Sequence, residues 1–317
     1  MNTRAFLGLS HSPLLGLNPL SQAADLQLHR ALEAARNRVT AYAPELVVLV
    51  APDHYNGFFN ELMPPFCIGM EATSVGDYQS IPGPLNVDAT AALALAEHLM
   101  DAGFDPAVSR KMRVDHGFAQ SLQLLWGSLD TPPIVPIFIN AVAQPGIPRA
   151  KRCREIGEGI GRFLDKEPRR TLLIGSGGLS HEPPVPTMLN PDPAVRERIT
   201  VRRESTPEQR EARMAQVMEA GRQMAAGCSK LKPINPAWDV RWMNALAEGG
   251  RALDEICELT EESIERDAGL SGNESKSWLV ARSALPTDRA LACSMRHYQV
   301  IPEYIAGFGV MFLEQLQ

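Results

Sequence analysis

The chain has 317 residues, 44% of them hydrophobic and 6% aromatic, and its 31 Lys and Arg against 37 Asp and Glu give a net charge of −6. A chain of this length can bury about 75% of its unfolded surface, so it needs neither disulfides nor a structural metal to form a core. The acidic balance argues against a nucleic-acid binder, because such a protein usually carries a basic face.

The five cysteines are widely spaced and include no C-x-x-C pair. This spacing disfavours a disulfide framework or a four-cysteine zinc site and favours a reducing compartment, so we expect a cytoplasmic protein. The first apolar stretch is interrupted by Ser10 and His11, which makes it a poor signal peptide. The longest apolar runs, 46–51 and 134–142, are shorter than the ~18 residues that indicate a membrane span. No membrane partner is therefore expected.

Short apolar runs alternate with amphipathic segments over the first two-thirds of the chain, which is typical of βαβ units. Residues 5–9 predict a strand, and apolar residues at spacings of four and three predict the helix that follows. Pro44 predicts the end of this helix, because the residue before a proline disfavours helical geometry. The run 46–50, LVVLV, then predicts a strand that is buried on both faces.

The Gly- and Pro-rich segment 56–87 predicts a long surface excursion, after which Asp88 is placed to cap a helix and Gly103 to close it. The remaining predictions are strands at 134–139 and 171–174, a helix around 149–165, a charged and mainly helical segment at about 190–290, and closing strands in YQVI and IAGFGVMF. Together they predict one α/β domain spanning 1–317, with a central mixed or mostly parallel sheet flanked by helices, rather than two independent domains.

Four of the seven histidines stand next to predicted strands. His11, His54 and His181 each follow a strand, and His116 lies between a short extended segment and a helix. Ligands of open α/β sheets gather beyond the carboxyl ends of the strands. A single histidine in such a turn is more often an ordinary hydrogen-bonding residue, but four of them indicate an active site.

Several histidines with few cysteines suit a redox-active or Lewis-acid metal. Two histidines and one carboxylate form the facial triad of non-haem Fe(II) oxygenases, which leaves positions open for substrate and dioxygen. Histidine is also the natural acid or base near neutral pH. Four histidines can therefore divide into two ligands and two proton-transfer groups, although spacing alone does not assign them. Phosphate-binding, nucleophile-elbow and H-E-x-x-H motifs are incomplete or absent.

Seven motifs, in unbroken order from about residue 6 to about residue 309, resemble the class III extradiol ring-cleavage dioxygenases. They are LSHSPLLG, VLVAPDHYNGFF, MPPFC, VDHGFAQ, IGSGGLSHEPPVP, NPAWD and IPEYIAGFG. The resemblance implies a mononuclear Fe(II) site. It further implies that dioxygen cleaves a 3-substituted catechol with a carboxylated side chain beside its hydroxyl pair, and that the enzyme is a homo-oligomer.

The same resemblance implies a role for five residues. His11 and His54 match the two histidine ligands of the iron, and Glu303 in IPEYIAGFG best matches its carboxylate ligand. His116 matches the proton donor and His181 the proton acceptor. One acid and one base that begin in opposite protonation states predict a bell-shaped pH profile.

Three neighbours of these residues are candidates for holding them in place. Asp115 either pairs with His116 or points elsewhere, and the same alternatives hold for Asp53 beside His54. Pro183 either stiffens the loop that carries His181 or belongs to a plain surface turn.

Three other functions stay open from the sequence. The first is the same chemistry on a protocatechuate- or homoprotocatechuate-like ring. The second is a metal-free binding protein of the same fold, which the intact ligand set speaks against. The third is a zinc hydrolase that uses the same histidines, which metal content after anaerobic purification would distinguish.

Overall fold

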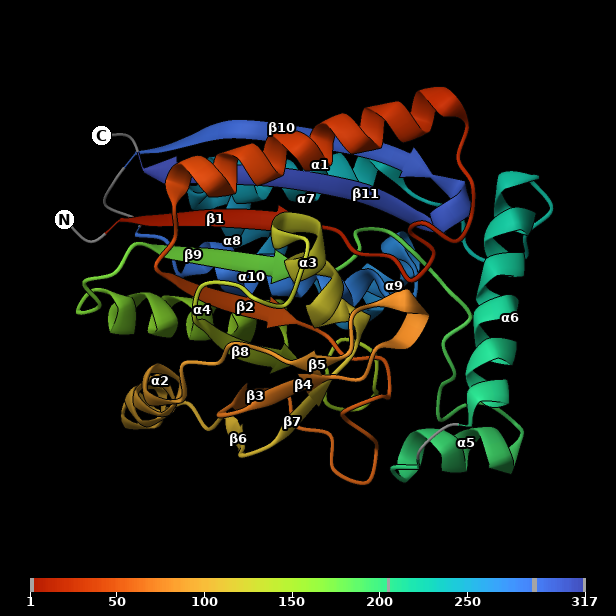
Figure 1. The fold of residues 1–317 in the computed structure, drawn as a ribbon, viewed down its shortest axis with the longest axis horizontal. Coiled ribbons are helices and arrows are strands. Elements are labelled where there is room, and N and C mark those ends of the chain that lie inside the picture. Colours follow the sequence, from red (N-terminus) through yellow and green to blue (C-terminus); the bar gives the residue numbers. More distant parts are fainter. Residues whose placement is uncertain (1–2, 204–205, 287–289, 316–317) are drawn as a thin grey trace.

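An eight-stranded sheet runs through the computed structural model, which describes residues 3–203, 206–286 and 290–315 (Figure 1). Its strands are β1 (Arg4–Leu9), β2 (Leu46–Ala51), β3 (Phe66–Gly69), β6 (Ala107–Ser109), β8 (Ile134–Ile139), β9 (Thr171–Ser176), β10 (Leu291–Ile301) and β11 (Ala306–Gln315), in the order β10-β11-β1-β9-β2-β8-β3-β6. A smaller sheet contains β4 (Ala72–Ser74), β5 (Gly83–Pro84) and β7 (Met112–Val114).

The centre of the large sheet is parallel. Strands β1, β9, β2 and β8 are parallel neighbours, whereas β11 is antiparallel to β1, β10 to β11, and β3 to β8. The predicted mixed α/β sheet is therefore confirmed. Because β1, β9 and β2 run in the same direction, their carboxyl ends meet at one edge of the sheet.

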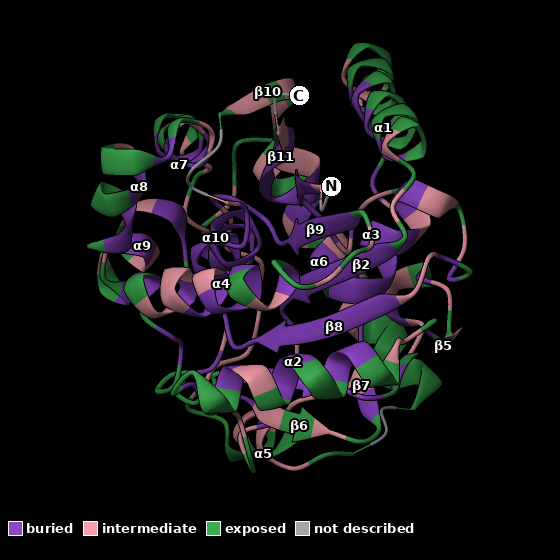
Figure 2. Cartoon of the chain, turned by 90° about the vertical axis from the view of Figure 1, so that its left-hand side faces the viewer, coloured by how far each residue is buried: buried purple, intermediate pink, exposed green. Residues whose placement is uncertain are grey.

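Helices cover both faces of this sheet (Figure 1). They are α1 (Gln22–Tyr42), α2 (Ala89–Asp101), α3 (His116–Trp126), α4 (Ala150–Leu164), α5 (Pro193–Thr200), α6 (Pro207–Ala225), α7 (Pro236–Glu248), α8 (Gly250–Cys257), α9 (Glu261–Ala268) and α10 (Lys276–Ser283), with the 3-10 turns η1 (Asp77–Gln79), η2 (Gly272–Ser275) and η3 (Pro302–Tyr304). Apolar residues of α1 and α3 form one core with the sheet, and those of α2, α4, α7 and α10 form the other. Figure 2 shows the resulting burial of β2, β8 and β9 between these layers.

Three local predictions about helix ends are confirmed. Helix α1 ends at Tyr42, and its C-cap residue Ala43, just before Pro44, has a left-handed φ of 50°. The side chain of Asp88 accepts a hydrogen bond from the amide of Ala91 at the start of α2. Gly103, just beyond the end of α2, has a φ of +82°, the conformation that glycine adopts most easily at a helix end.

The segment 56–87 is more ordered than the prediction of a surface excursion. It contains β4, β5 and η1, and its strand β3 is fully buried within the large sheet. This strand has only four residues between Pro65 and Met70, too few for a period to be read. The segment predicted to be helical at about 190–290 contains α5 to α10, while 204–205 and 287–289 lie outside the described residues.

Among the described residues, none of the helices combines the length and the apolar character that crossing a bilayer requires.

Candidate active site

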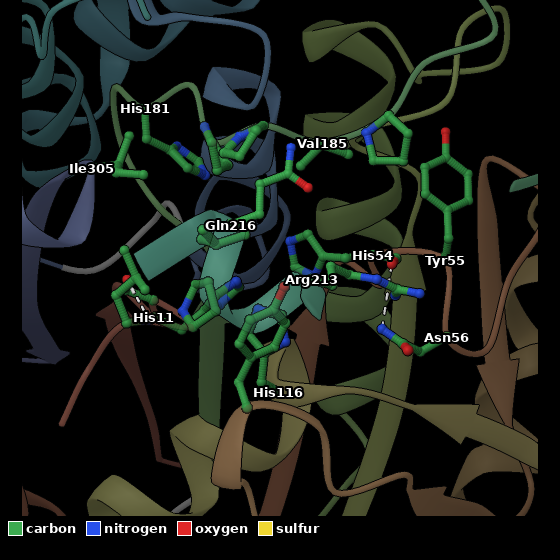
Figure 3. Close-up of a pocket in the computed structure, with 18 of the residues that line it drawn as sticks. His11, His54, Tyr55, Asn56, His116, His181, Val185, Arg213, Gln216 and Ile305 are labelled. Atoms are coloured by element: carbon green, nitrogen blue, oxygen red, sulfur yellow. Dashed lines mark hydrogen bonds between the residues drawn. The ribbon is translucent and has the colours of Figure 1, made fainter. Parts of the chain in front are cut away.

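Four histidines meet where the parallel strands end. His11 follows β1, His54 follows β2, His181 follows β9, and His116 is the first residue of α3. The ring centroid of His54 lies 4.6 Å from that of His116 and 5.5 Å from that of His11. Figure 3 shows these side chains in one pocket. The four histidines therefore share one cavity.

Each of the four rings is held through its Nδ1 atom. Nδ1 of His11 lies 2.9 Å from the hydroxyl of Ser176, and Nδ1 of His181 lies 2.8 Å from the carbonyl oxygen of Leu179. Nδ1 of His54 lies 3.0 Å from a carboxylate oxygen of Asp115, and Nδ1 of His116 lies 2.6 Å from one of Asp77. A neutral ring that donates its Nδ1 proton keeps a lone pair on Nε2, so these contacts prepare Nε2 atoms to bind a metal or a proton.

A buried carboxylate, Glu274 of η2, faces three of these Nε2 atoms. Its oxygens lie 3.4 Å from Nε2 of His11, 3.2 Å from that of His54 and 3.0 Å from that of His181. The amide of Gly178 also donates to it, at 3.2 Å. Burial raises the pKa of Glu274, but the charges of His181 and His54 lower it more, so the net pKa lies well below its usual value.

Two glycines bring Glu274 to this position. Gly8 of β1 and Gly175 of β9 are partners in the parallel register. A Cβ atom on Gly8 would lie 2.2 Å from the ring of Trp278, and one on Gly175 would lie 2.5 Å from its Cα. Only residues without a side chain let α10 lie directly on these strands, and Glu274 enters the site just ahead of α10.

The structure does not place Glu303, the carboxylate expected from the sequence motif, in the lining of the cavity that the histidines share. Glu303 lies in η3, where its carbonyl oxygen accepts from Asn18 at 2.9 Å. Its neighbours Tyr304 and Ile305 line the cavity, but Glu303 is not among the described lining residues. The carboxylate that faces the histidines is Glu274.

Asp115 contacts His54 rather than its neighbour in sequence. One of its oxygens lies 2.7 Å from the amide nitrogen of His54 and 3.0 Å from the Nδ1 atom of the same residue, whereas Nδ1 of His116 is 4.0 Å away. The side chain also accepts from the amide of Gly117 at the start of α3. Asp115 therefore links the loop after β2 to the helix that carries His116.

The carboxylate that pairs with His116 is Asp77 of η1. Its oxygens lie 2.6 Å from Nδ1 and 2.8 Å from the amide nitrogen of His116. Burial lowers the pKa of His116, but Asp77 and then Asp115 raise it more, so the net shift is upward. The Nε2 atom of His116 is buried and has no hydrogen-bond partner, so it is directed at a group that the protein itself does not provide.

Asp53 acts on the backbone beyond His54. Its side chain accepts from the amides of Asn56, Gly57 and Phe58, at 2.9 to 3.1 Å. Burial, with a further contribution from Asp115, raises the pKa of Asp53 to about 7. Its contribution is to hold the turn that follows His54.

The cavity in front of the histidines has a volume of about 290 Å³. Its lining includes Pro183, together with Pro184, Val185 and Pro186 of the same loop. The loop begins at His181, whose amide donates to the carbonyl of Ala268 at 2.8 Å. Pro183 thus belongs to a cavity wall rather than to a plain surface turn.

Burial and the charge of Glu274 shift the pKa values of His11 and His181 in opposite directions. Burial lowers the pKa of His11 to about 3, so its ring is neutral, as a metal ligand must be. Burial also lowers the pKa of His181, but the charge of Glu274 raises it more, so the net shift is upward. The buried site therefore joins a neutral imidazole to a strongly acidic carboxylate.

Two clusters among the described residues can hold a metal ion by their spacing. Nitrogens of His11, His54 and His116 lie within 4.8 Å of one another, and so do ligand atoms of Asp77, Asp115 and His116. In the second cluster both carboxylates are occupied by hydrogen bonds to histidines and amides. The first cluster, with Glu274 facing His11 and His54, offers the donor set that suits a divalent transition metal.

Sequence reasoning missed Asp77 and Glu274. Glu274 is the single acidic residue between Asp267 and the apolar run 278–281, and it stands among small polar residues. This contrast with the charged helices around it is a signal that could have found it. Asp77 lies in an ordinary Gly-Asp-Tyr turn, where no comparable signal exists.

Residues 5–309 match the family described as the catalytic LigB subunit of aromatic ring-opening dioxygenase. The chain is 62% identical over 311 residues to the 2,3-dihydroxyphenylpropionate/2,3-dihydroxicinnamic acid 1,2-dioxygenase of Comamonas testosteroni, covering 98% of this chain and 96% of that protein. It is 48% identical over 303 residues to the protein of the same name from Burkholderia vietnamiensis, covering 96% and 95%. A solved structure of an uncharacterized Escherichia coli K12 protein has the same fold, with a TM-score of 0.56 at 14% identity over 98% of this chain and 99% of that one.

The family match spans nearly the whole chain, from residue 5 to residue 309. The resemblance to extradiol ring-cleavage enzymes in the sequence motifs is thereby confirmed, and the chain belongs to the aromatic ring-opening dioxygenases of the LigB family.

Proposed function

We propose that the protein cleaves 3-(2,3-dihydroxyphenyl)propanoate, and also 2,3-dihydroxycinnamate, with dioxygen in an Fe(II)-dependent extradiol reaction. The observation that carries the proposal is the meeting of His11, His54 and Glu274 at the carboxyl edge of the sheet. The high identity to relatives named for these substrates supports the choice of catechol. The product is a 2-hydroxy-6-oxo-nona-2,4-dienedioate that retains both oxygen atoms of dioxygen.

The Nε2 atoms of His11 and His54 and the carboxylate of Glu274 are the proposed ligands. The donor set fits the ion, because two imidazoles and one carboxylate are the set that non-haem Fe(II) oxygenases use. When bound, Fe(II) supplies open positions for the two catechol oxygens and for dioxygen. Ser176 and Asp115 support the ligands by holding the Nδ1 atoms of His11 and His54.

His181 is the proposed proton acceptor. Its Nδ1 atom is held by the carbonyl of Leu179, so Nε2 is the atom that faces the cavity. The charge of Glu274 is the main influence that raises the pKa of His181. A divalent cation held by Glu274 would share that charge and weaken its influence on His181. Nε2 of His181 is the atom that would take a phenolic proton from the catechol.

His116 is the proposed proton donor. Asp77 holds its Nδ1 atom and favours the charged ring, so the proton on the buried Nε2 atom is the one that it can give. The recipient is the oxygen that develops negative charge as the bond within dioxygen breaks. His116 and His181 thereby begin in opposite protonation states, as an acid and a base must.

The proposal treats the chain as a single domain in the cytoplasm. Helices α6 to α10 of the segment at about 190–290 share their cores with the sheet, which supports one domain. All five cysteines are free, and a reducing compartment keeps them so. The homo-oligomeric state stays a prediction, which light scattering on the purified protein measures directly.

The test is anaerobic reconstitution with Fe(II), followed by 3-(2,3-dihydroxyphenyl)propanoate and air-saturated buffer. We expect the uptake of one dioxygen per catechol and a yellow dienoate product. Enzyme loaded with zinc is the control and should take up no dioxygen. Absence of both signals with Fe(II)-loaded protein would contradict the proposed function.

A further inference from the structure

We propose that Arg213 and Arg198 together bind the carboxylate of the substrate's side chain and so select catechols that carry an anionic arm. This inference rests on the proposed function and assigns the specificity-determining part of the same cavity. Both arginines line that cavity, one from α6 and the other from α5. These helices stand at the edge of the sheet where β1, β9 and β2 end (Figure 1).

The helical period aims Arg213 at the site. Arg213, Val217 and Gly221 follow one another at intervals of four along α6, so they share one face of the helix. Val217 and Gly221 are the buried residues of α6. A Cβ atom on Gly221 would lie 2.3 Å from the carbonyl oxygen of Glu303, so this face packs tightly against η3. Arg213 therefore points into the body of the protein, and Figure 3 shows it in the pocket with the histidines.

Arg198 reaches the same cavity from a second fixed helix. Its neighbour Ile199 is buried, and the carbonyl of Ile199 accepts from the amide of Asn60 at 2.9 Å. The carbonyl of Thr200 accepts from the amide of Glu61 at 2.8 Å. The end of α5 is thus attached to the loop that follows His54, which keeps Arg198 at the mouth of the cavity.

The charges around the cavity are unequal. Among the described lining residues, Glu274 is the only carboxylate, and it is directed at the histidines. The same lining contains arginines and the apolar side chains of Phe59, Val185 and Ile199. Apolar side chains together with guanidinium groups match a short hydrocarbon arm that ends in a carboxylate.

The two guanidinium groups lie within electrostatic reach of each other. Burial, and then the positive charge of Arg213, lowers the pKa of Arg198. The charge of Arg213 also acts to lower the pKa of Tyr78 against the larger effect of burial, and the ring of Tyr78 lies 5.3 Å from that of His116. Arg213 is therefore close enough to both Arg198 and Tyr78 for its charge to affect them. An anion between the two arginines would relieve their repulsion.

A third arginine of the lining has a different role. Arg203 donates to Glu197 at 2.8 Å, and both side chains are largely exposed. Arg203 therefore lines the cavity while its guanidinium group contacts an exposed carboxylate. It is the rival to test against Arg213 and Arg198.

The test compares two catechols of equal length, 3-(2,3-dihydroxyphenyl)propanoate and 3-propylcatechol, which lacks the carboxylate. For the Fe(II)-loaded enzyme, Arg213→Gln should raise KM for the acid by about tenfold to a hundredfold, as expected for loss of a hydrogen bond between charged groups. Arg198 is more exposed, so Arg198→Gln should raise it by about two- to fivefold. Neither variant should change kcat or the KM for 3-propylcatechol by more than about twofold, a bound that reflects a carboxylate-specific contact.

Two matched variants complete the test. Arg213→Lys restores the charge without the planar fork and should recover part of the loss. Arg210→Gln removes one exposed positive charge from α6 outside the cavity lining and should leave both substrates unaffected. Anaerobic binding of each catechol gives a readout that is independent of turnover and should follow the same pattern.

Three results would overturn the inference. Equal losses for both catechols would show a structural role for Arg213 and Arg198. A selective loss in Arg203→Gln alone would move the carboxylate site to Arg203. If the wild-type enzyme cleaves neither catechol, the proposed function fails, and the inference fails with it.

Discussion

The hydroxyl oxygen of Ser176 lies 2.9 Å from Nδ1 of His11, and it donates its own proton to the carbonyl oxygen of Gly117 at 2.6 Å. Ser121 donates to the same hydroxyl at 2.7 Å. Since the single proton of Ser176 is committed to Gly117, His11 must supply the proton of their shared hydrogen bond. The neutral ring of His11 then carries its lone pair on Nε2, the atom that faces Glu274.

Removing this contact should weaken metal binding. We expect Ser176→Ala to lower the affinity for Fe(II) by about 10- to 100-fold, the usual cost of losing a group that orients a ligand. Competition with a chelator under anaerobic conditions measures it. Ser121→Ala, which removes a partner of Ser176 but not of His11, should have a smaller effect. Equal affinities in Ser176→Ala and the wild type would show that Ser176 does not orient His11.

Glu274 and Glu303 are a matched pair of carboxylates for testing the ligand set. Glu274→Gln keeps the shape of the side chain and removes the charge that faces His11 and His54, so we expect loss of bound iron and of activity. Glu303→Gln should keep both, because its side chain lies outside the cavity lining. Iron content after anaerobic reconstitution and oxygen uptake are the measurements. The opposite pattern would restore the assignment made from the sequence motif.

Asp77 should set the alkaline side of the pH profile. The titratable groups facing His116 are Asp77, Asp115, His54 and His11, and the two carboxylates raise the pKa of His116 above its ordinary value. A raised pKa keeps the ring protonated to higher pH, and activity is lost as the pH rises through it. Asp77→Asn removes the largest raising influence, so the alkaline limb of kcat should move to lower pH.

A profile of kcat against pH for Asp77→Asn and the wild type measures this shift. Asp101→Asn, at the exposed end of α2, is the control and should leave the profile unchanged. An unshifted alkaline limb in Asp77→Asn would contradict the role of His116 as the donor.

Gly8 and Gly175 should be intolerant of alanine for different reasons. Either substitution forces an added methyl group against α10 and should destabilise the fold by about 1–3 kcal/mol. At Gly8 the obstacle is the Trp278 side chain, whereas at Gly175 it is backbone. Trp278→Leu should therefore offset part of the cost of Gly8→Ala but not that of Gly175→Ala.

Urea denaturation followed by circular dichroism gives the free energies of unfolding for these variants. A double-mutant cycle then isolates the coupling between position 8 and Trp278. If the free-energy changes of Trp278→Leu add fully to those of Gly8→Ala and of Gly175→Ala, α10 does not lie in direct contact with these strands.

Much of the fold could be predicted because its signals are local. The buried run 46–50, the cap at Asp88 and the turns carrying the histidines depend on neighbours in sequence. Strand β3 was not predicted, because its four residues lie between turn-forming segments and are too few to show a period. Its burial comes from pairing with β8, which is distant in sequence.

The site was predictable in part for the same reason. His11 and His54 follow strong strand signals, so their meeting could be deduced from the topology of a parallel sheet. Asp77 and Glu274 do not follow strands of the parallel sheet, and their positions depend on how η1 and α10 pack. The motif near Glu303 was conspicuous, but tertiary packing decides which carboxylate enters the cavity.

His54 and Glu274 are 220 positions apart in the chain, and they meet only after α10 has settled on the glycines of β1 and β9. Contacts between such distant segments form late, because a long loop must close before they contribute any stability. A chain still emerging from the ribosome holds His11 and His54 without the carboxylate that faces them. With the proposed ligand set, capture of the metal is therefore restricted to molecules that have finished folding.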